Sequence, residues 1–338
     1  MSTVIRSPNW IGDGIMCLPA IRAFKSSFPD ERLAVAAKRY LADLFLNIPE
    51  IDEILPLPDR WTPRSIAAAI GEFRHRGFQR GILFTNSFSS ALFFRLAGIR
   101  SLAGYARDGR GFLLRDRVPP PPAGGHHQHY YLNIIGHLAA KSSDRSFPAV
   151  LVISAEEKER AADWLREKGI SSERPLLAVS PTAAFGSAKA WLPDRFREVI
   201  RRWLEKFPEA AVLLLGGGSE RERIAAIADG LPGSVLNLAG ALDLRRSLAV
   251  LSRCRLFVGN DSGLMHAAAA LSVPLVAVFG PTEPGRTAPL AGRFRLLHHP
   301  VECAPCRRRE CPADHRCMTA VGVDEVLAAA TELWRGTE

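Results

Sequence analysis

The sequence predicts an α/β protein built from two Rossmann-like, doubly wound domains. Its 338 residues exceed what a single hydrophobic core usually serves, so two domains of roughly 150 to 170 residues are expected. Short apolar or β-branched runs alternate with helical patterns along both halves, which is typical of parallel sheets covered by helices. We expect one domain in residues 1–150, a second in 151–320, and a C-terminal helix in 321–338.

The composition is that of an ordinary globular protein, with 47% apolar and 23% charged residues. No signal-peptide pattern opens the sequence, and no run approaches the ~18 apolar residues of a membrane span, so we expect a cytoplasmic protein. The net charge of +9 favours anionic partners, among them nucleotide phosphates, an acidic glycolipid or the inner leaflet of a membrane. Nucleic acid is not expected, because no nucleic-acid-binding motif accompanies the charge.

Strands and helices alternate through the first half. Strands are expected at residues 4–5, 33–37, 51–55 and 81–85. Helices are expected in the amphipathic stretch up to residue 28 and at 66–76, 89–98 and 129–140. Between the last two helices lies an irregular loop with four prolines at 119–122 and a Gly-Gly pair at 124–125.

The second half repeats this alternation after a loop at residues 143–154, where we place the domain boundary. Strands are expected at residues 176–180, 211–215, 235–238, 256–258 and 275–279. Helices are expected at 155–168, 193–206, 220–228, 244–251 and 262–271. A last helix at 323–334 is expected to pack back across the domain junction. In doubly wound folds, ligands bind at the carboxyl ends of the strands.

A glycine-bracketed turn, SPNWIGDG at residues 7–14, follows the first strand and opens a helix. It places Asp13 near a helix N-terminus, where the helix dipole favours an ionised carboxylate that can accept a proton. The alternative is that Asp13 only caps the helix, and the spacing alone favours that interpretation.

A second turn of small residues, VGNDSGLMHA at 258–267, also joins a strand to a helix. The unpartnered backbone N–H groups of a helix start suit a diphosphate, and Gly263 lets phosphates approach. Equally supported alternatives are that Asp261 and Ser262 cap the helix and that His266 is an interior histidine. The rigid loop at 279–284 follows a neighbouring strand and is suited to lining the same site.

Two further loops carry candidate residues. Lys189 follows the strand at 176–180, where a cation can neutralise negative charge developing on a leaving diphosphate; a solvated lysine is the usual alternative. The glycine triplet at 216–218 precedes Glu220 and resembles a nucleotide-binding turn, although any tight turn can use glycine.

Four of the six cysteines, Cys303, Cys306, Cys311 and Cys317, crowd into one arginine-rich segment. Their spacing suits a tetrahedral structural zinc, and reduced thiols without metal are a somewhat better supported alternative. We expect no catalytic role for such a metal. Nearby arginines are candidates for binding phosphates or for forming a solvated basic face: Arg307, Arg308, Arg309 and Arg316.

Taken together, these segments resemble the glycosyltransferase family 9 heptosyltransferases along essentially the whole chain. The resemblance is carried by long matches: the motif at residues 7–13, NSF with SAL at 86–92, AGI at 97–99, FG with AK and Trp191 at 185–191, and NDSGLMH at 260–266. One departure is visible, because the family's Lys-x-Trp-Pro becomes Lys-Ala-Trp-Leu-Pro at 189–193. The inserted residue changes the expected path of that loop.

The resemblance implies a glycosyltransferase-B arrangement, in which the two domains face each other across a cleft, and an inverting sugar transfer. The implied donor is ADP-heptose, and the implied acceptor is a precursor of the lipopolysaccharide inner core. No cofactor is required for catalysis, and the protein would contact the inner face of the cytoplasmic membrane peripherally. The proline-rich loop at 119–125 is then a candidate acceptor-facing element, and a plain surface connection is equally supported.

The resemblance also assigns roles by position. Asp13 would be the general base on the acceptor hydroxyl, Lys189 would stabilise the departing phosphate, and Asp261 would contact the donor sugar. Thr182, Ser262, Gly263 and His266 would surround the diphosphate, and Glu220 and Leu242 would meet the adenosine. The candidate acceptor-binding residues are Asn9, Trp10, Asn86 and Ser87. Alternatives are another sugar-nucleotide transferase of the family, a nucleotide-sugar epimerase on the same fold, and a non-catalytic module that binds anionic polymers.

Overall fold

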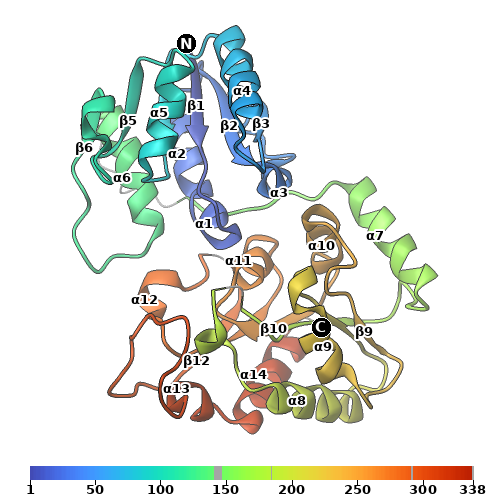
Figure 1. The fold of residues 1–338 in the computed structure, drawn as a ribbon. Coiled ribbons are helices and arrows are strands. Elements are labelled where there is room, and N and C mark those ends of the chain that lie inside the picture. The colour runs from blue at the N-terminus through green and yellow to red at the C-terminus, as the bar shows by residue number, and fades with distance from the viewer. Residues whose placement is uncertain (141–146, 184, 291, 337–338) are drawn as a thin grey trace. The chain divides into compact units, whose positions relative to one another are not determined.

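The computed structural model describes residues 1–140, 147–183, 185–290 and 292–336. The chain divides into two compact units, Met1–Val152 (unit 1) and Ile153–Glu338 (unit 2). Each unit holds one six-stranded sheet whose strands all pair in parallel (Figure 1). The expected loop at 143–154 begins outside the described residues.

Unit 1 has its strands in the order β3-β2-β1-β4-β5-β6. These are β1 (Ser2–Arg6), β2 (Arg32–Lys38), β3 (Glu53–Leu57), β4 (Arg80–Leu83), β5 (Ser101–Tyr105) and β6 (Asp116–Val118). Its helices are α1 (Ile11–Met16), α2 (Leu18–Ser27), α3 (Arg39–Ala42), α4 (Pro63–Arg76), α5 (Phe88–Leu96) and α6 (Gln128–Ala139), with 3₁₀ turns η1 (Asp43–Phe45) and η2 (Arg110–Leu113).

Unit 2 has the order β12-β11-β10-β7-β8-β9. Its strands are β7 (Leu176–Ser180), β8 (Ala211–Leu214), β9 (Val235–Asn237), β10 (Leu256–Asn260), β11 (Leu275–Phe279) and β12 (Phe294–His298). Its helices are α7 (Ala155–Glu167), α8 (Pro193–Lys206), α9 (Arg221–Ala228), α10 (Leu244–Leu251), α11 (Gly263–Ala270), α12 (Pro284–Thr287), α13 (Arg316–Thr319) and α14 (Val323–Arg335), with 3₁₀ turns η3 (Ser187–Lys189) and η4 (Gly218–Glu220).

Both sheets share one topology. Chain order reverses between β1 and β4 in unit 1 and between β7 and β10 in unit 2, which is the strand order of dinucleotide-binding folds. The sequence prediction missed β5, β6 and β12, which extend the sheets toward their edges. β6 is three residues long and mostly charged, and β5 contains a glycine, so neither shows the apolar pattern of a buried strand.

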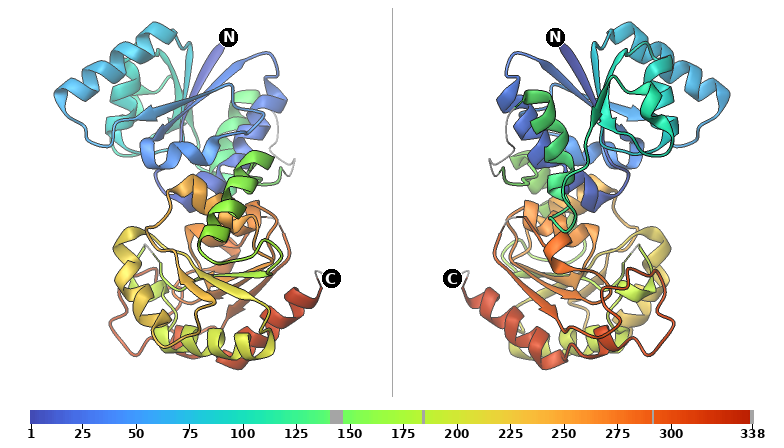
Figure 2. Two further views of the ribbon diagram at one scale, coloured as in Figure 1. Left: turned by 90° about the vertical axis from the view of Figure 1, so that its right-hand side faces the viewer. Right: turned by 90° about the vertical axis from the view of Figure 1, so that its left-hand side faces the viewer.

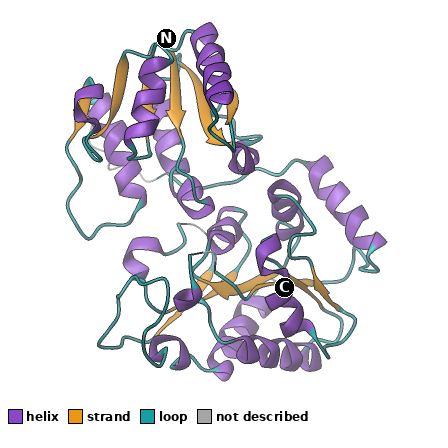
Figure 3. Ribbon diagram, viewed as in Figure 1, coloured by secondary structure: helices purple, strands orange, loops and turns teal. Residues whose placement is uncertain are grey.

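Helices cover both faces of each sheet (Figures 2 and 3). In unit 1, α4 and α5 lie on one face, and α2 and α6 pack together on the other. Local capping fixes where several helices start: Thr62 caps α4 with Ser65, and Ser154 caps α7 with Glu157. No described helix is long and apolar enough to cross a membrane.

Helix α14 belongs to the core of unit 2. It packs against α8 and the strands β10, β11 and β12. Trp334 is 1% exposed and meets Trp203 of α8 edge-on, with 5.1 Å between ring centroids. The apolar face of α14 is therefore buried in the core of unit 2. The expected packing of this helix across the domain junction stays a prediction.

We expect Trp334→Ala to lower the free energy of unfolding of unit 2 by about 3–5 kcal/mol, because it leaves a large cavity beside Trp203. Chemical denaturation of the full chain followed by circular dichroism measures this loss. The matched control is Trp61→Ala, since Trp61 is 43% exposed and should cost much less. Equal losses in the two variants would show that α14 does not complete the core.

Candidate active site

The candidate residues cluster where the strand order reverses. In unit 1, the first turn of α1, which follows β1, carries Asp13, and the turn after β4 carries Asn86 and Ser87. In unit 2, Lys189 follows β7 and Asp261 follows β10. Because β1 and β4 are neighbours, as are β7 and β10, these turns emerge side by side at the carboxyl edge of each sheet, where doubly wound folds bind ligands.

Asp13 is held by two aromatic side chains from the start of α6. Its Oδ1 lies 3.2 Å from His127 Nε2 and accepts a hydrogen bond from the Tyr131 hydroxyl at 3.4 Å. Burial raises the pKa of Tyr131, and the Asp13 carboxylate raises it further, so the hydroxyl stays a donor. The helix cap at α1 is Trp10 and not Asp13. The capping interpretation of Asp13 is therefore wrong, and its carboxylate is 26% exposed.

The turn before Asp13 is fixed by a buried arginine. Arg6 is 5% exposed, and its guanidinium donates to Asn9 Oδ1 at 2.7 Å. Burial lowers the Arg6 pKa to about 10, a value at which the group is still charged at neutral pH. The side-chain oxygen of Asn9 therefore serves to hold the turn by accepting from Arg6. Trp10, the next residue, is 52% exposed. Acceptor binding by these two residues stays a prediction.

A second polar group of unit 1 joins Asn86 to the same region. The Asn86 side chain exchanges hydrogen bonds of 2.8 and 3.0 Å with the Tyr130 hydroxyl. Tyr130 in turn stacks on His127 with nearly parallel rings 5.6 Å apart. Ser87 caps α5 by accepting from the Ser90 amide, so it has a structural use. The start of α6 therefore connects Asn86 to Asp13.

The sequence prediction did not identify this role of His127, Tyr130 and Tyr131. The available signal was the run HHQHYY at residues 126–131, directly after the proline-rich loop. Five titratable or aromatic rings at a helix start, after a rigid loop, are unusual for a plain surface connection.

In unit 2, an ion pair bridges the point where strand order reverses. Lys189 Nζ lies 2.6 Å from Asp261 Oδ2, and the Thr282 hydroxyl donates to the same oxygen at 2.7 Å. Asp261 is 4% exposed and the Lys189 side chain 14% exposed. An ammonium group has three N–H donors, so Lys189 keeps donor capacity beyond Asp261. The loops after β7, β10 and β11 thus converge on one carboxylate.

Asn260, the last residue of β10 and the neighbour of Asp261, forms hydrogen bonds to the loop that follows β7. It is fully buried, its Oδ1 accepts from the Trp191 amide at 2.9 Å, and its amide lies 3.5 Å from the Thr182 carbonyl. Trp191 is itself fully buried against Phe196. The residue inserted after Trp191 therefore does not displace Lys189, because the loop is anchored before the insertion.

Helix α11 begins directly after this cluster. Ser262 is its N-cap and accepts from the Met265 amide at 3.4 Å, so the capping interpretation of Ser262 is confirmed. That cap uses one of the first N–H groups and leaves those of the first turn, starting at Gly263, suited to an anion. His266, the fourth residue of α11, is 4% exposed, as the interior interpretation predicts.

The side chains of Glu220 and Thr182 both lie close to Gly216. A Cβ atom built on Gly216 would lie 3.2 Å from Glu220 Oε2 and 3.5 Å from Thr182 Oγ1. Glu220 is 8% exposed; its Oε2 accepts from the Gly217 amide at 2.7 Å, while its Oε1 is buried with no hydrogen-bond partner among the described residues. A buried carboxylate oxygen without a donor is costly, and a ligand hydroxyl would satisfy it.

Leu242 is brought next to this loop by two glycines. Gly240 has φ +67° and approaches Gly218 so closely that a Cβ on Gly240 would lie 2.6 Å from the Gly218 Cα. Leu242, two residues later, lines a cavity of about 620 Å³ between α7 and α10. The half-buried Leu242 side chain therefore belongs to this cavity wall.

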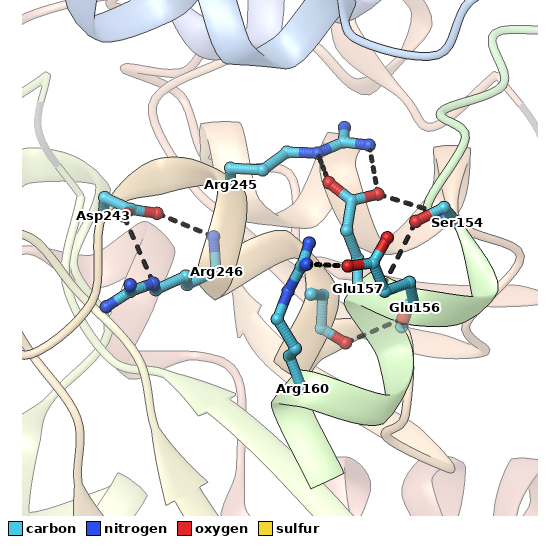
Figure 4. A network of polar contacts seen from close by, with 9 residues as sticks. Ser154, Glu156, Glu157, Arg160, Asp243, Arg245 and Arg246 are labelled. Atoms are coloured by element: carbon cyan, nitrogen blue, oxygen red, sulfur yellow. Dashed lines mark hydrogen bonds and ion pairs between the residues drawn. The ribbon is translucent and has the colours of Figure 1, made fainter. Parts of the chain in front are cut away.

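The same cavity is built around an ion pair between α7 and α10 (Figure 4). Glu157 accepts from Arg245 Nε at 2.6 Å and from a second guanidinium nitrogen at 2.8 Å, and its Oε2 also accepts from the Ser154 amide. Hydrogen bonding from Arg245 lowers the Glu157 pKa to about 2. This pair fixes the first helix of unit 2 to the helix that follows Leu242.

The structure does not support the zinc alternative for the cysteine segment. All six cysteines are free thiols, and among the described residues no three His, Cys, Asp or Glu side chains are arranged to hold a metal ion. Cys303 is exposed, whereas Cys317 is buried in the core of unit 2. Burial, and then the neighbouring thiols, raise the Cys317 pKa, so the group favours the protonated thiol over the thiolate that zinc requires.

Two doubly wound units, one with a carboxylate and the other with a lysine and a helix start at the ligand-binding edge, define a glycosyltransferase of the B type. Residues 66–316 match the model of glycosyltransferase family 9 (heptosyltransferase). The chain belongs to this family and is a glycosyltransferase.

Several heptosyltransferases are similar to this chain. It is 30% identical over 312 residues to lipopolysaccharide heptosyltransferase 2 of Salmonella typhimurium, covering 88% of each chain. It is 25% identical to lipopolysaccharide heptosyltransferase 1 of Pseudomonas aeruginosa, over 92% of this chain and 87% of that protein. The structure of E. coli ADP-heptose lipopolysaccharide heptosyltransferase II matches with a TM-score of 0.87 at 26% identity, covering 100% of this chain and 99% of that one. These matches confirm the predicted fold class and family.

Glu157→Gln should destabilise the chain at neutral pH by about 3 kcal/mol, because Arg245 would keep a buried charge without its partner. The Glu157 pKa is about 2 in the folded chain and 4.5 ordinarily. The stabilisation from the carboxylate is therefore complete above about pH 4.5 and is lost as the pH falls toward 2. Urea unfolding of both proteins between pH 7 and pH 3 measures this difference, which should shrink in acid.

The matched control is Glu198→Gln, which removes an exposed ion pair with Arg201. Surface pairs of this kind contribute little, so the control should unfold nearly like the wild type. A loss in Glu157→Gln that does not change with pH would contradict the assigned charge of Glu157.

Proposed function

We propose that this chain transfers L-glycero-D-manno-heptose from ADP-heptose onto heptosyl-Kdo2-lipid A, a precursor of the lipopolysaccharide inner core, with inversion at the anomeric carbon. The observation that carries the proposal is the buried Lys189–Asp261 ion pair beside the start of α11, a cation placed at a site suited to a diphosphate. The resemblance to heptosyltransferase 2 across most of the chain supports the choice of substrates.

The donor would lie along the carboxyl edge of the second sheet. The first N–H groups of α11 at Ser262 and Gly263 would bind the diphosphate, with Thr182 and His266 lining the pocket. Glu220 Oε1, which lacks a partner among the described residues, would accept a hydrogen bond from a ribose hydroxyl. Leu242 would meet the adenine, and Asp261 would contact the heptose while holding Lys189.

The acceptor would bind at the carboxyl edge of the first sheet, near Trp10 and Asn86. Asp13 would take the proton of the attacking acceptor hydroxyl while the oxygen of that hydroxyl forms a bond to the anomeric carbon. The bond from that carbon to the phosphate oxygen breaks at the same time, and ADP leaves with the electron pair. Lys189 would neutralise the charge that develops on the ADP phosphate.

The environment of Asp13 fits the proposed role. His127 and Tyr131 orient the carboxylate and leave it 26% exposed, so that a substrate hydroxyl can reach it. The acceptor is a membrane glycolipid, and we therefore place the enzyme in the cytoplasm with peripheral contact to the inner membrane.

A second candidate is the transfer of the first heptose rather than the second. The similarity to heptosyltransferase 1 of Pseudomonas aeruginosa, at 25% identity, keeps this alternative open. Incubating the purified enzyme and ADP-heptose with an acceptor that carries no heptose, and separately with one that carries one heptose, distinguishes the two candidate functions. We expect turnover only with the acceptor that already carries one heptose.

Asp13→Asn should reduce turnover at least ~10²-fold, the typical effect of losing a general base. Folding and ADP binding should be unchanged, because the asparagine oxygen can still accept from Tyr131 and because the donor residues lie in unit 2. ADP release with ADP-heptose and monoheptosylated acceptor measures turnover, and Asp30→Asn, an exposed aspartate, is the control. Turnover equal to that of the control would remove Asp13 from the proposed role.

A further inference from the structure

Exposed apolar side chains are unevenly distributed between the two units. Among the described residues, all eight large apolar side chains with strong exposure lie in unit 1: Met1, Trp10, Tyr40, Leu46, Trp61, Leu92, Leu96 and Phe112. Single exposed apolar residues are ordinary, whereas a contiguous group on one face marks an interaction surface.

Half of them gather around α5. Phe88, Leu92 and Leu96 follow one another at four-residue spacing, so they form a stripe along one side of the helix. Leu92 is 37% and Leu96 46% exposed. Phe112, from the 3₁₀ turn η2, is 70% exposed and lies 6.1 Å from Phe88 between ring centroids, which extends the stripe beyond the helix start.

Trp61 borders the stripe on the side of α4. It is 43% exposed and packs edge-on against Phe93 of α5 at 5.2 Å. We call Trp61, Phe88, Leu92, Leu96 and Phe112 together the α5 surface. It lies on the face of the unit 1 sheet that α4 and α5 cover, and α2 and α6 cover the other face (Figure 2).

Arginines without carboxylate partners flank the residues of the α5 surface: Arg95 lies on α5 itself, and Arg117 donates to the Gly111 carbonyl of η2. Seven exposed arginines flank its residues in the sequence, and none forms an ion pair within the described parts of the chain: Arg60, Arg64, Arg95, Arg100, Arg107, Arg115 and Arg117. Several other arginines of unit 1 are paired with carboxylates, as Arg76 is with Glu53 and Arg80 with Glu31.

The carboxylates nearest in sequence do not neutralise these arginines. Asp59 lies 3.6 Å from Arg39, and Asp108 accepts from the Phe88 amide at 2.7 Å. Asp116 on β6 is half-buried. Unit 1 as a whole has nineteen Lys and Arg against twelve Asp and Glu, and so carries +7 of the net charge of +9. The partner of this surface is therefore apolar in part and anionic.

We propose that the α5 surface docks onto the surface of a bilayer containing anionic phospholipids. Phe112, Leu92, Leu96 and Trp61 enter the boundary between headgroups and acyl chains, and the surrounding arginines bind lipid phosphates while their aliphatic stems cover apolar area. Amphipathic aromatic side chains and unpaired arginines are what such an interface selects. The assignment deepens the proposed function, whose acceptor is a membrane glycolipid, by naming the surface that meets the membrane.

Vesicle flotation of the purified full-length protein tests this. We expect binding to vesicles of phosphatidylcholine with phosphatidylglycerol, weaker binding to phosphatidylcholine alone, and release by high salt. Phe112→Ser should weaken binding on the order of tenfold, and replacement of Arg107 or Arg115 by Gln by about fivefold each. The matched control is Leu46→Ser, because Leu46 is as exposed as Leu92, at 37%, but lies outside the α5 surface.

Absence of wild-type binding to anionic vesicles, or equal loss in Phe112→Ser and Leu46→Ser, would overturn the assignment. Binding that is insensitive to lipid charge would do the same, because the arginines would then not bind lipid phosphates. The lipid assay contains neither donor nor acceptor, so its result is independent of the transfer reaction. ADP release with a detergent-solubilised acceptor should be unchanged in Phe112→Ser, and its failure in the wild type would count against the proposed function alone.

Discussion

The reversal of strand order in each sheet is the constraint on which the site depends. At this point two neighbouring parallel strands send their following turns in opposite directions, which leaves an opening at the carboxyl edge. In unit 2 the Lys189–Asp261 ion pair spans this opening from the turn after β7 to the turn after β10, and Thr282 joins it from the loop after β11. Three loops far apart in sequence are thereby held on one buried carboxylate, which no single loop could do.

The two units use this shared topology for opposite electrostatic purposes. In unit 1 the opening presents a partly exposed carboxylate, Asp13, oriented by the neutral hydroxyl of Tyr131 and by His127. In unit 2 it presents a cation, held by Asp261 Oδ2, and the start of α11. Under the proposed function, Asp13 would accept the proton and the edge of the second sheet would bind the leaving diphosphate, the two roles that a displacement at a sugar phosphate requires.

Sequence patterns predicted the long elements and the turns that follow buried strands, because glycine-rich turns and apolar runs are local signals. They did not predict β5, β6 or β12; β6, for example, is three residues long with two charged side chains and lacks the apolar run of a buried strand. Asp13, Lys189 and Asp261 were recognisable from their motifs, whereas the support from Tyr131, Asn260 and Thr282 depends on contacts between distant segments. The choice between a zinc site and reduced thiols could not be made from the sequence either, because spacing fixes which cysteines are close in sequence, whereas the burial of Cys317 depends on the core.

The central claim is that the carboxyl edge of the second sheet binds the donor diphosphate through Lys189 and the start of α11. Isothermal titration calorimetry of ADP against Lys189→Met tests it most directly, with Lys158→Met, an exposed lysine, as control. The account predicts at least about tenfold weaker ADP binding in Lys189→Met, because a charge-assisted hydrogen bond is lost, and wild-type affinity in the control. Wild-type affinity in both variants, with Lys189→Met correctly folded, would contradict it.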